Sequence, residues 1–256
     1  MEIFIPVHQK DLGVLPTTVA SVCRFVTPQP TRIVFVSNDK VLKNLVGMFG
    51  KRRNFEFLRE SSIIPDLTIE SIPRIYNGSE DRRGWYFQQL LKLSFSRFAI
   101  QKYYAVFDAD MVLVRDLPLF INNKYIFYQT QSLHKPYFIT YEKLFGYERV
   151  AQKSFICNFM VFDCCILEQL KQEIETRLLK RWDLAILSMI DQKELSSFSE
   201  FETYGNFFLT RFPDECILRE YKELTLSAHR FAFHPVFKYV AKMKKYIAIT
   251  YHNYRR

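Results

Sequence analysis

Two aspartates that end an apolar run, in the stretch YYAVFDAD at residues 103–110, are the side chains best placed to do chemistry. Short apolar runs are typical of buried strands, and ligands of open α/β sheets bind beyond the carboxyl ends of the strands. Asp108 and Asp110 are two residues apart, so both can project to one side and approach one hard divalent cation. We therefore expect them to face a cleft and to hold Mg²⁺ or Mn²⁺, an ion that would carry a phosphate. A solvated Asp-x-Asp turn is the alternative interpretation.

The elements that must position these aspartates alternate between strand and helix. The apolar runs predict six strands, at 2–8, 32–38, 55–58, 103–107, 125–129 and 155–163. Helical spacing of apolar residues predicts helices at 15–25, 39–49, 84–100, 166–182 and 183–190. Such alternation predicts an α/β, Rossmann-like fold with a mixed, mainly parallel sheet flanked by helices. Between them, the polar stretch 61–81, with Pro65, Pro73, Asn77 and Gly78, has the length of a lid or binding loop.

The composition indicates one globular domain. The chain has 256 residues, of which 48% are hydrophobic and 16% aromatic, too many for a disordered protein. No apolar stretch reaches the length of a membrane-spanning helix, and the N-terminus lacks the pattern of a signal peptide, so we expect a cytoplasmic location. The five cysteines are odd in number and have no C-x-x-C spacing, so we expect them to be reduced and mostly buried.

The net charge of +9 favours an anionic partner, which can be nucleic acid, an anionic membrane face or an anionic small substrate. No nucleic-acid-binding module accompanies the charge, so we expect no nucleic acid. The stretch KMKKYIAITYHNYRR at 242–256 mixes cations with aromatics in a pattern compatible with a helix. Such a helix can lie on an anionic bilayer, which would make the protein peripheral at the inner membrane, or it can be an ordinary solvated helix.

Four segments together resemble a bacterial family of uncharacterised glycosyltransferase-type proteins, DUF6492, with the GT-A fold. They are RRGWYFQQLLKL at 82–93, FDADMVLVRDLP at 107–118, FICNFMVFD at 155–163 and FSEFETYGNF at 198–207. The resemblance covers most of residues 1–210. It implies a transferase that uses a nucleotide-sugar donor and in which Asp108 and Asp110 form the Asp-x-Asp metal motif.

The resemblance also implies how the chain is divided. Residues 1–256 would form a single GT-A-like catalytic domain, in which 1–120 is the nucleotide-binding half and 121–215 the acceptor half. Residues 216–256 would be a basic, aromatic C-terminal segment. From the bacterial setting of the family, the acceptor is expected to be a glycan or glycolipid of the cell surface, such as lipopolysaccharide or capsule.

The chemistry of the residues is consistent with that reaction. A sugar nucleotide leaves as a diphosphate, and a divalent ion between two aspartates and the phosphates neutralises the charge that develops as the bond breaks. Cations in the flanking segment would also help to neutralise the charge of the departing diphosphate. The alternative interpretation is that these cations are ordinary surface charges. The donor- or acceptor-binding candidates in this segment are Arg82, Arg83, Trp85, Tyr86, Gln89 and Lys92. Among these, Trp85 and Tyr86 are expected to stack on a sugar face or on the nucleotide base.

The catalytic candidates are Glu200 and Glu202, because aromatic surroundings can raise the pKa of a carboxyl towards that of a general base. We expect Glu200 to deprotonate the acceptor hydroxyl and Glu202 to be a structural or acceptor-binding partner. A strand would turn both to one face, whereas a helix start would separate them and allow both to be capping residues. Tyr204 and Asn206 are expected to hydrogen-bond sugar hydroxyls.

Other polar residues are single candidates. Asn158 lies within an apolar strand and is expected to point into the cleft, because a buried amide needs partners. Either His134 or His234 could supply a further metal or phosphate contact, and His234 is the metal-ligand candidate; a packing role among aromatics is the alternative. Asp163 is expected to cap the helix that follows it.

Two other functions are compatible with parts of the sequence. A haloacid-dehalogenase-type phosphatase would use Asp108 as nucleophile and Asp110 as acid and base, but its motif normally opens the chain and continues with Gly-Thr, whereas Met-Val-Leu follows here. A sugar-binding protein without catalysis would keep the aromatics but has no need of paired carboxylates at a strand end. The absence of G-x-G-x-x-G and Walker-type loops argues against dinucleotide oxidoreductases and P-loop enzymes.

Overall fold

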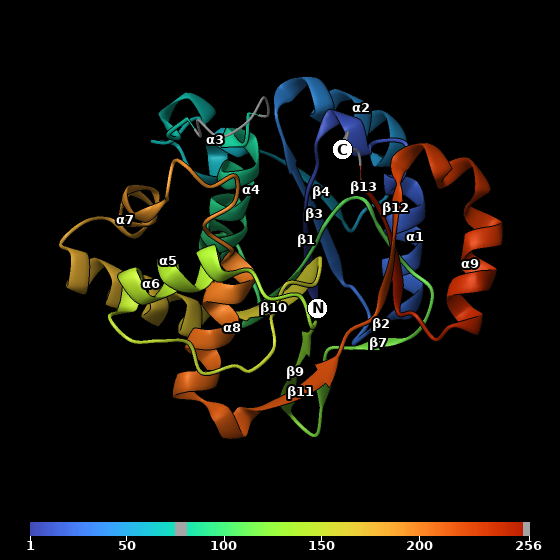
Figure 1. Ribbon diagram of the computed structural model, residues 1–256. Coiled ribbons are helices and arrows are strands. Elements are labelled where there is room, and N and C mark those ends of the chain that lie inside the picture. Colours follow the sequence, from blue (N-terminus) through green and yellow to red (C-terminus); the bar gives the residue numbers. More distant parts are fainter. Residues whose placement is uncertain (75–80, 253–256) are drawn as a thin grey trace.

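The computed structural model describes residues 1–74 and 81–252, built around a five-stranded central sheet (Figure 1). The strand order is β10-β5-β1-β3-β4, and all neighbours are parallel except β10, which is antiparallel to β5. The strands are β1 (Glu2–Pro6), β3 (Arg32–Ser37), β4 (Phe55–Arg59), β5 (Tyr103–Phe107) and β10 (Phe159–Asp163). The predicted mixed, mainly parallel sheet is therefore confirmed.

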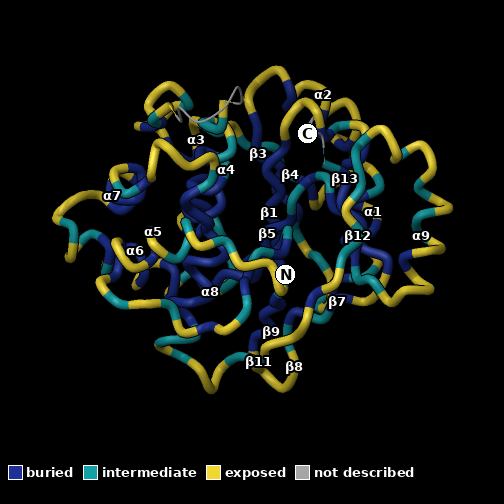
Figure 2. The backbone as a smooth tube through the Cα atoms, viewed as in Figure 1, coloured by how far each residue is buried: buried dark blue, intermediate teal, exposed yellow. Residues whose placement is uncertain are grey.

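Helices cover both faces of this sheet. In Figure 1, α1 (Leu15–Phe25) and α2 (Asp39–Phe49) lie on one side, and α4 (Arg83–Ser94), α6 (Cys164–Leu178) and α8 (Glu200–Arg211) lie on the other. Strands enclosed in this way need apolar residues at nearly every position, which is why β1, β5 and β10 are continuous apolar runs that are buried almost throughout (Figure 2). The remaining helices are α3 (Glu60–Ile63), α5 (Lys135–Phe145), α7 (Trp182–Met189) and α9 (His234–Met243).

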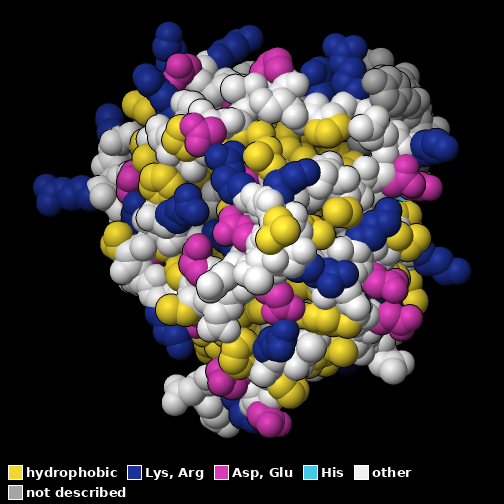
Figure 3. Space-filling view, turned by 90° about the vertical axis from the view of Figure 1, so that its left-hand side faces the viewer, with side chains coloured by type: hydrophobic (Ala, Val, Ile, Leu, Met, Phe, Trp, Pro, Cys, Tyr) yellow, Lys and Arg dark blue, Asp and Glu magenta, His cyan; other side chains and the backbone are white. Residues whose placement is uncertain are grey.

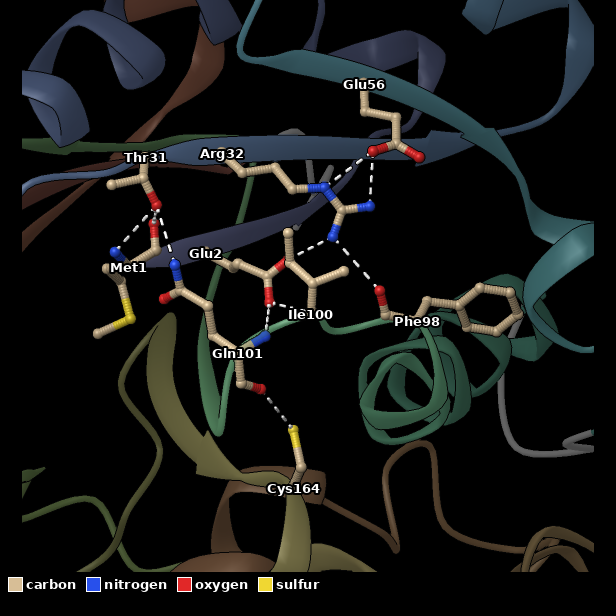
Figure 4. Close-up of polar contacts among 9 residues, drawn as sticks. All are labelled: Met1, Glu2, Thr31, Arg32, Glu56, Phe98, Ile100, Gln101 and Cys164. Carbon is tan, nitrogen blue, oxygen red and sulfur yellow. Dashed lines mark hydrogen bonds and ion pairs between the residues drawn. The ribbon is translucent and has the colours of Figure 1, made fainter.

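The amino ends of the strands are held together by an ionic cluster around the buried Glu2 (Figure 4). The carboxylate of Glu2, wholly buried, pairs with Arg32 and accepts hydrogen bonds of 2.8 Å from the backbone N–H groups of Ile100 and Gln101. Arg32 Nε in turn donates to Glu56 Oε2 at 2.8 Å. These contacts join β1, β3, β4 and the entry to β5, so they fix the strand order at this end of the sheet.

The order of the strands reverses between β1 and β5, because the chain runs from β1 to β3 and β4 on one side and then returns to β5 on the other. Neighbouring connections leave in opposite directions at such a switch point, and a crevice forms beyond the carboxyl ends of the two strands. The two aspartates follow β5 directly, so the fold places them at this crevice.

Smaller sheets extend the molecule. One has the order β12-β13-β6, from β12 (Glu223–Ser227), β13 (Ala248–His252) and β6 (Met111–Leu113), and packs with α9 around a second apolar cluster. Another has the order β11-β9-β8, from β11 (Cys216–Glu220), β9 (Lys124–Gln129) and β8 (Phe120–Ile121). A short parallel pair joins β2 (Val26–Thr27) to β7 (Leu117–Pro118).

The predicted helix in the stretch 242–256 is wrong. Helix α9 ends at Met243, and 248–252 form β13, whose first four residues are buried because they pair with β12 and β6. Residues 253–256 lie outside the described part of the chain. The stretch 61–81 is also not one loop, since it contains the end of α3 and a 3₁₀ turn at Ile69–Ser71; Asn77 and Gly78 lie outside the described residues.

The five cysteines are free, as predicted, but Cys157 alone is buried and Cys165 is exposed. Asp163 caps α6 as predicted, and its side chain accepts hydrogen bonds from the N–H groups of Cys165 and Ile166. In the part of the chain that the structure describes, no helix combines the length and the apolar character needed to cross a bilayer.

Candidate active site

A cavity of about 430 Å³ opens at the carboxyl ends of β1, β3, β4 and β5. Its volume lies in the range of small-molecule sites, roughly 300–1,000 Å³. Segments far apart in the sequence contribute residues to its lining. They are the end of β1 and the turn after it, Asn38 after β3, Glu60 after β4, one face of α4 with the turn before it, residues 108–110, and His252. The cavity therefore occupies the crevice at the switch point of the sheet.

Asp108 and Asp110 both line this cavity, as the spacing of the two residues predicted. Asp108 Oδ1 accepts from Lys92 Nζ at 2.7 Å, and the backbone N–H of Asp108 donates to the Asn158 carbonyl at 2.8 Å. Asp110 Oδ2 lies 3.3 Å from His252 Nδ1. Each carboxylate is thus held by a cationic or imidazole partner at the edge of the cavity.

His252 is a site residue that the sequence did not reveal. Strand β13 pairs antiparallel with β6, which follows Asp110, and this pairing carries His252 to the aspartates. Burial alone would lower the pKa of His252, but the hydrogen bond and the negative charge of Asp110 outweigh it and raise the pKa. The signal available was a polar residue at the end of the apolar alternation IAITYH.

The structure does not bring His234, the predicted metal ligand, to the aspartates. His234 Nδ1 lies 2.8 Å from the hydroxyl of Tyr251. Tyr251 precedes His252 on β13, and successive side chains of a strand point to opposite faces, so His234 lies on the face away from Asp110. His134, the other histidine considered, has its Nε2 2.7 Å from the carbonyl of Ser196.

Asp11 is a third aspartate at the cavity, and it is also a residue that the sequence analysis did not identify. It lies in the 3₁₀ turn Gln9–Asp11 after β1 and is only 5% exposed. Its Oδ1 has no hydrogen-bond partner among the described residues. Burial raises the pKa of Asp11 to about 7, and the negative charge of Asp110 adds to the effect. An Asp shortly after the first strand was the available signal, since parallel strands end at the same edge of a sheet.

Lys92 lies at the centre of the charged groups. Its side chain is 4% exposed, and Nζ lies 2.7 Å from both Asp108 Oδ1 and Glu200 Oε1. Burial alone would lower the pKa of Lys92, but the two carboxylates outweigh it and raise the pKa. Lys92 is therefore a fixed positive charge that links α4, the end of β5 and the start of α8.

Glu200 and Glu202 lie in the first turn of α8, not on a strand. Ser199 caps this helix and accepts from the N–H of Glu202, and the helix turns the two carboxylates in different directions. Glu200 faces Lys92, and burial raises its pKa against the opposing effect of that lysine. Glu202 accepts from Ser154 Oγ and Phe155 N, both at 2.8 Å, so it anchors the chain before β10. The described lining of the cavity includes neither glutamate.

Of the other candidates in α4 and the turn before it, Arg82 and Trp85 line the cavity. The guanidinium carbon of Arg82 lies 4.6 Å from the centroid of the Trp85 ring. Arg83 instead pairs with Asp81, its Nε donating at 2.9 Å. The hydroxyl of the buried Tyr86 accepts from the N–H of Ser197 at 2.9 Å. The segment thus presents a stacked Arg–Trp pair to the cavity.

The remaining candidates hold neighbouring segments together. Gln89 Oε1 accepts from the N–H of Glu200 at 3.1 Å. Asn158 Nδ2 donates to Thr250 Oγ1 at 2.9 Å and to Glu223, which ties β10 to the smaller sheet. Tyr204 and Asn206 are buried on α8. The Tyr204 hydroxyl accepts from Asp163 N at 2.8 Å, and Asn206 Oδ1 from Ala151 N at 3.0 Å. The described lining includes none of these four residues.

Across residues 1–74 and 81–252, no three His, Cys, Asp or Glu side chains are already arranged to hold a metal ion. The donors at the cavity nevertheless fit a hard cation, because they are carboxylate oxygens and one imidazole. One carboxylate oxygen of Asp108 accepts the hydrogen bond from Lys92, and its other oxygen is available to a cation. Asp11 Oδ1, which has no hydrogen-bond partner among the described residues, is a further buried acceptor at the cavity.

Comparison with solved structures defines the class of fold. Over 93% of its length the chain is similar to mouse xyloside xylosyltransferase 1 in its apo form, with 10% identity, 91% of that chain covered and a TM-score of 0.51. The galactosyltransferase LgtC, in complex with donor and acceptor sugar analogues, aligns over 98% of this chain and 87% of its own, with 12% identity and a TM-score of 0.46. The protein has an α/β fold of the GT-A glycosyltransferase type, as predicted.

The sequence matches the family of unknown function DUF6492 over residues 7–235. The chain belongs to this family, so the family assignment made from the sequence is confirmed. A search of curated proteins finds no match.

Proposed function

We propose that the protein is a glycosyltransferase that uses a nucleotide-sugar donor and a divalent cation, Mn²⁺ or Mg²⁺. The observation that carries the proposal is the position of Asp108 and Asp110: both line a cavity at the switch point of a GT-A-type sheet, with His252 beside Asp110. Crevices at such switch points bind nucleotides in other α/β folds. The fold of the similar transferases supports the same reaction class.

Asp108, Asp110 and His252 are the proposed ligands of the cation. When bound, the cation supplies positive charge to the diphosphate that departs from the sugar. His252 has to give up its proton before a ring nitrogen can bind a metal, and Asp110 raises the pKa of that proton. Binding of Mn²⁺ to the protein without substrate is therefore expected to weaken from pH 8 to pH 6, which isothermal titration calorimetry measures independently of activity.

The protein's own cations complete the donor site in this proposal. Lys92 is held between Asp108 and Glu200, so its charge is in place before a donor binds and needs no reorganisation during the reaction. Arg82 and Trp85 present a guanidinium over an aromatic face at the cavity wall, a surface suited to a base or a sugar face.

A general base must reach the hydroxyl that it deprotonates. Glu200 faces Lys92 and Glu202 faces the chain before β10, so we propose that both are positioning residues. The sequence-based alternative, Glu200 as base, makes a different prediction. If Glu200 is the base, Glu200→Gln removes the acidic limb of the pH–rate profile, where protonation of the base lowers the rate, and costs roughly 100-fold or more in rate. A positioning role leaves the shape of the profile unchanged.

Following the resemblance of the sequence, we take the acceptor to be a bacterial surface glycan or glycolipid, such as lipopolysaccharide or capsule. Transfer to it would take place at the cytoplasmic side of the inner membrane. The first experiment addresses the donor.

The test is metal-dependent hydrolysis of a panel of sugar nucleotides, followed as release of the nucleoside diphosphate. Mn²⁺ or Mg²⁺ is expected to support slow hydrolysis of one donor, and a chelator to abolish it. Asp108→Asn and Asp110→Asn should each lose about 100-fold, since a tenfold loss corresponds to about 1.4 kcal/mol and metal stabilisation is worth several kcal/mol. Asp116→Asn, at an exposed aspartate of the same segment, is the matched control and should retain activity.

Two outcomes would replace the proposal. Hydrolysis of simple phosphate esters with no sugar nucleotide consumed would indicate the phosphatase alternative. Saturable sugar binding without turnover, unchanged in Asp108→Asn and Asp110→Asn, would indicate a binding protein.

A further inference from the structure

Helix α9 carries apolar side chains on its solvent side. Its inner face, with Phe237 and Ala241, packs on the smaller sheet β12-β13-β6. On the outside, four residues at spacings of three or four form an exposed stripe. They are Phe233, Val236, Tyr239 and Met243, which are 63%, 61%, 67% and 68% exposed. Such spacing places the four side chains on one face of the helix, so α9 and the residue before it present two apolar faces, of which the protein covers one.

The segment that carries this stripe has charges of one sign. Between residues 228 and 247 the sequence contains no Asp or Glu, and its five cations are Arg230, Lys238, Lys242, Lys244 and Lys245. All are exposed except Lys238, which is half-buried. On the side of the molecule away from α9, by contrast, acidic and basic side chains are interspersed (Figure 3). The stripe and its cations therefore form a surface that differs from that opposite face.

The positive charge of this segment distinguishes between the partners that could cover the stripe. A second copy of the chain in a twofold contact would place the same patch against itself, so five cations would face five cations without an acidic group from residues 228–247. A partner has to be anionic and also able to take up exposed aromatic and aliphatic side chains along a single helix face. The interface of an anionic lipid bilayer has both properties, because lysines bind the headgroups while apolar side chains enter the acyl boundary.

We propose that α9 docks the protein on an anionic membrane, with Phe233, Val236, Tyr239 and Met243 inserted at the interface and the lysines on the headgroups. The sequence alone suggested membrane contact through a helix at 242–256; the structure moves the contact surface to 233–245, because 248–252 are a strand of the smaller sheet.

The position of α9 gives the docking a functional consequence, which rests on the proposed function. The chain leaves α9 at Met243, turns, and enters β13, whose last residue His252 lies at the cavity. The same small sheet therefore carries the docking helix on one side and a cavity residue on the other. A bilayer bound to α9 holds the cavity close to the membrane, which favours a lipid-linked acceptor over a free glycan.

The test is co-sedimentation of the full chain with vesicles. Vesicles of phosphatidylcholine with about 30% phosphatidylglycerol are expected to bind the protein, and vesicles of pure phosphatidylcholine at least tenfold less. Raising the salt to about 0.5 M should reduce binding, because the Debye length shortens. Val236→Asp/Met243→Asp should lose at least tenfold in partition, and so should Lys242→Glu/Lys244→Glu/Lys245→Glu.

The matched control is Ile139→Asp/Leu184→Asp, which places two aspartates at exposed apolar positions of α5 and α7, away from α9. It should bind vesicles like the wild type. Thermal unfolding, expected to be unchanged in all variants, shows that they fold. Equal binding to both vesicle types, no binding to either, or equal losses in the control would overturn the proposal. A concentration-dependent dimer that the Val236→Asp/Met243→Asp variant abolishes would indicate a second copy as occupant instead.

Donor hydrolysis in solution separates this inference from the proposed function. Val236→Asp/Met243→Asp should hydrolyse a free donor as the wild type does, since neither residue lines the cavity. A protein without any donor hydrolysis would overturn the catalytic proposal, while sedimentation would still decide whether α9 binds the bilayer.

Discussion

Replacing Lys92 with methionine removes a cation that two carboxylates share and keeps much of the apolar length of the side chain. Lys92 Nζ lies 2.7 Å from Asp108 and from Glu200, and the side chains of Lys92 and Glu200 are 4% and 5% exposed. Without the lysine, Glu200 stays buried with a negative charge and loses its ion pair. The variant therefore measures what the central charge contributes to the folded state, whatever reaction the protein catalyses.

The structure allows the loss to be sized. Removing one partner of a buried ion pair typically costs about 3–5 kcal/mol. Asp108 is a quarter exposed, so water screens its share, and most of the cost comes from Glu200. We expect the free energy of unfolding at pH 7 to fall by about 3 kcal/mol. The urea midpoint should then fall by about 1–1.5 M, taking an m-value of 2–3 kcal/mol per M.

The loss should depend on pH. Burial raises the pKa of Glu200 above its unfolded value, and the charge and hydrogen bond of Lys92 oppose this increase. In Lys92→Met this opposition is lost. A carboxyl whose pKa is raised in the folded state costs stability as pH rises through that pKa, and the cost disappears once the carboxyl is protonated. The difference between Lys92→Met and wild type should therefore be smaller at pH 5 than at pH 7, and Glu200→Gln in the Lys92→Met background should restore part of the stability at pH 7.

Urea unfolding followed by circular dichroism at both pH values measures these quantities. Lys102→Met is the matched control. Lys102 Nζ lies 3.4 Å from Oδ2 of the buried Asp163, but the lysine side chain itself is 66% exposed, so water screens its charge. An ion pair screened in this way is worth about 1 kcal/mol or less. A midpoint shift in Lys92→Met no larger than that in Lys102→Met, or a shift that is equal at pH 5 and pH 7, would refute the reasoning.

Three further predictions concern stability. Asp11→Asn should be more stable than wild type at pH 8 by at least about 1 kcal/mol and show less pH dependence between pH 4 and 8 in thermal unfolding, because the folded pKa of Asp11 is raised to about 7 and its ionisation costs stability. Glu202→Gln should lose about 1.5–3 kcal/mol in urea unfolding through its bonds to 154–155; a neutral result would remove its anchoring role. Arg32→Met should lose about 3 kcal/mol by calorimetry, since it strands the buried Glu2, and rescue by Glu2→Gln is expected; a fully stable single variant would contradict this.

The sequence predicted well what depends on local pattern. The strands of the central sheet are continuous apolar runs because both faces are covered, so β1, β3 and β5 were recognisable without partners. The place of Asp108 and Asp110 followed from the same pattern, since they come directly after β5. Asp163 was recognisable as a helix cap for a similarly local reason.

What the sequence did not reveal depends on contacts between distant segments. His252 reaches Asp110 because β13 pairs with β6, and no local signal specifies that pairing. For Lys92 the sequence left a donor-site cation and a surface charge open, and it did not reveal that the side chain is buried. It is buried because α8 and the end of β5 both bring a carboxylate to it. For Glu200 and Glu202 the sequence pattern was compatible with either a strand or a helix. The structure shows a helix, which Ser199 caps.

The pairing of β13 with β6 also affects how the protein folds. Asp110 and His252 are 142 residues apart in the sequence. Closing so long a loop has a high entropic cost, and contacts of large sequence separation generally slow folding. We expect the crossover units around β1, β3 and β4 to acquire protection from hydrogen exchange first and β13 later, so that an early folding intermediate lacks the contact between Asp110 and His252.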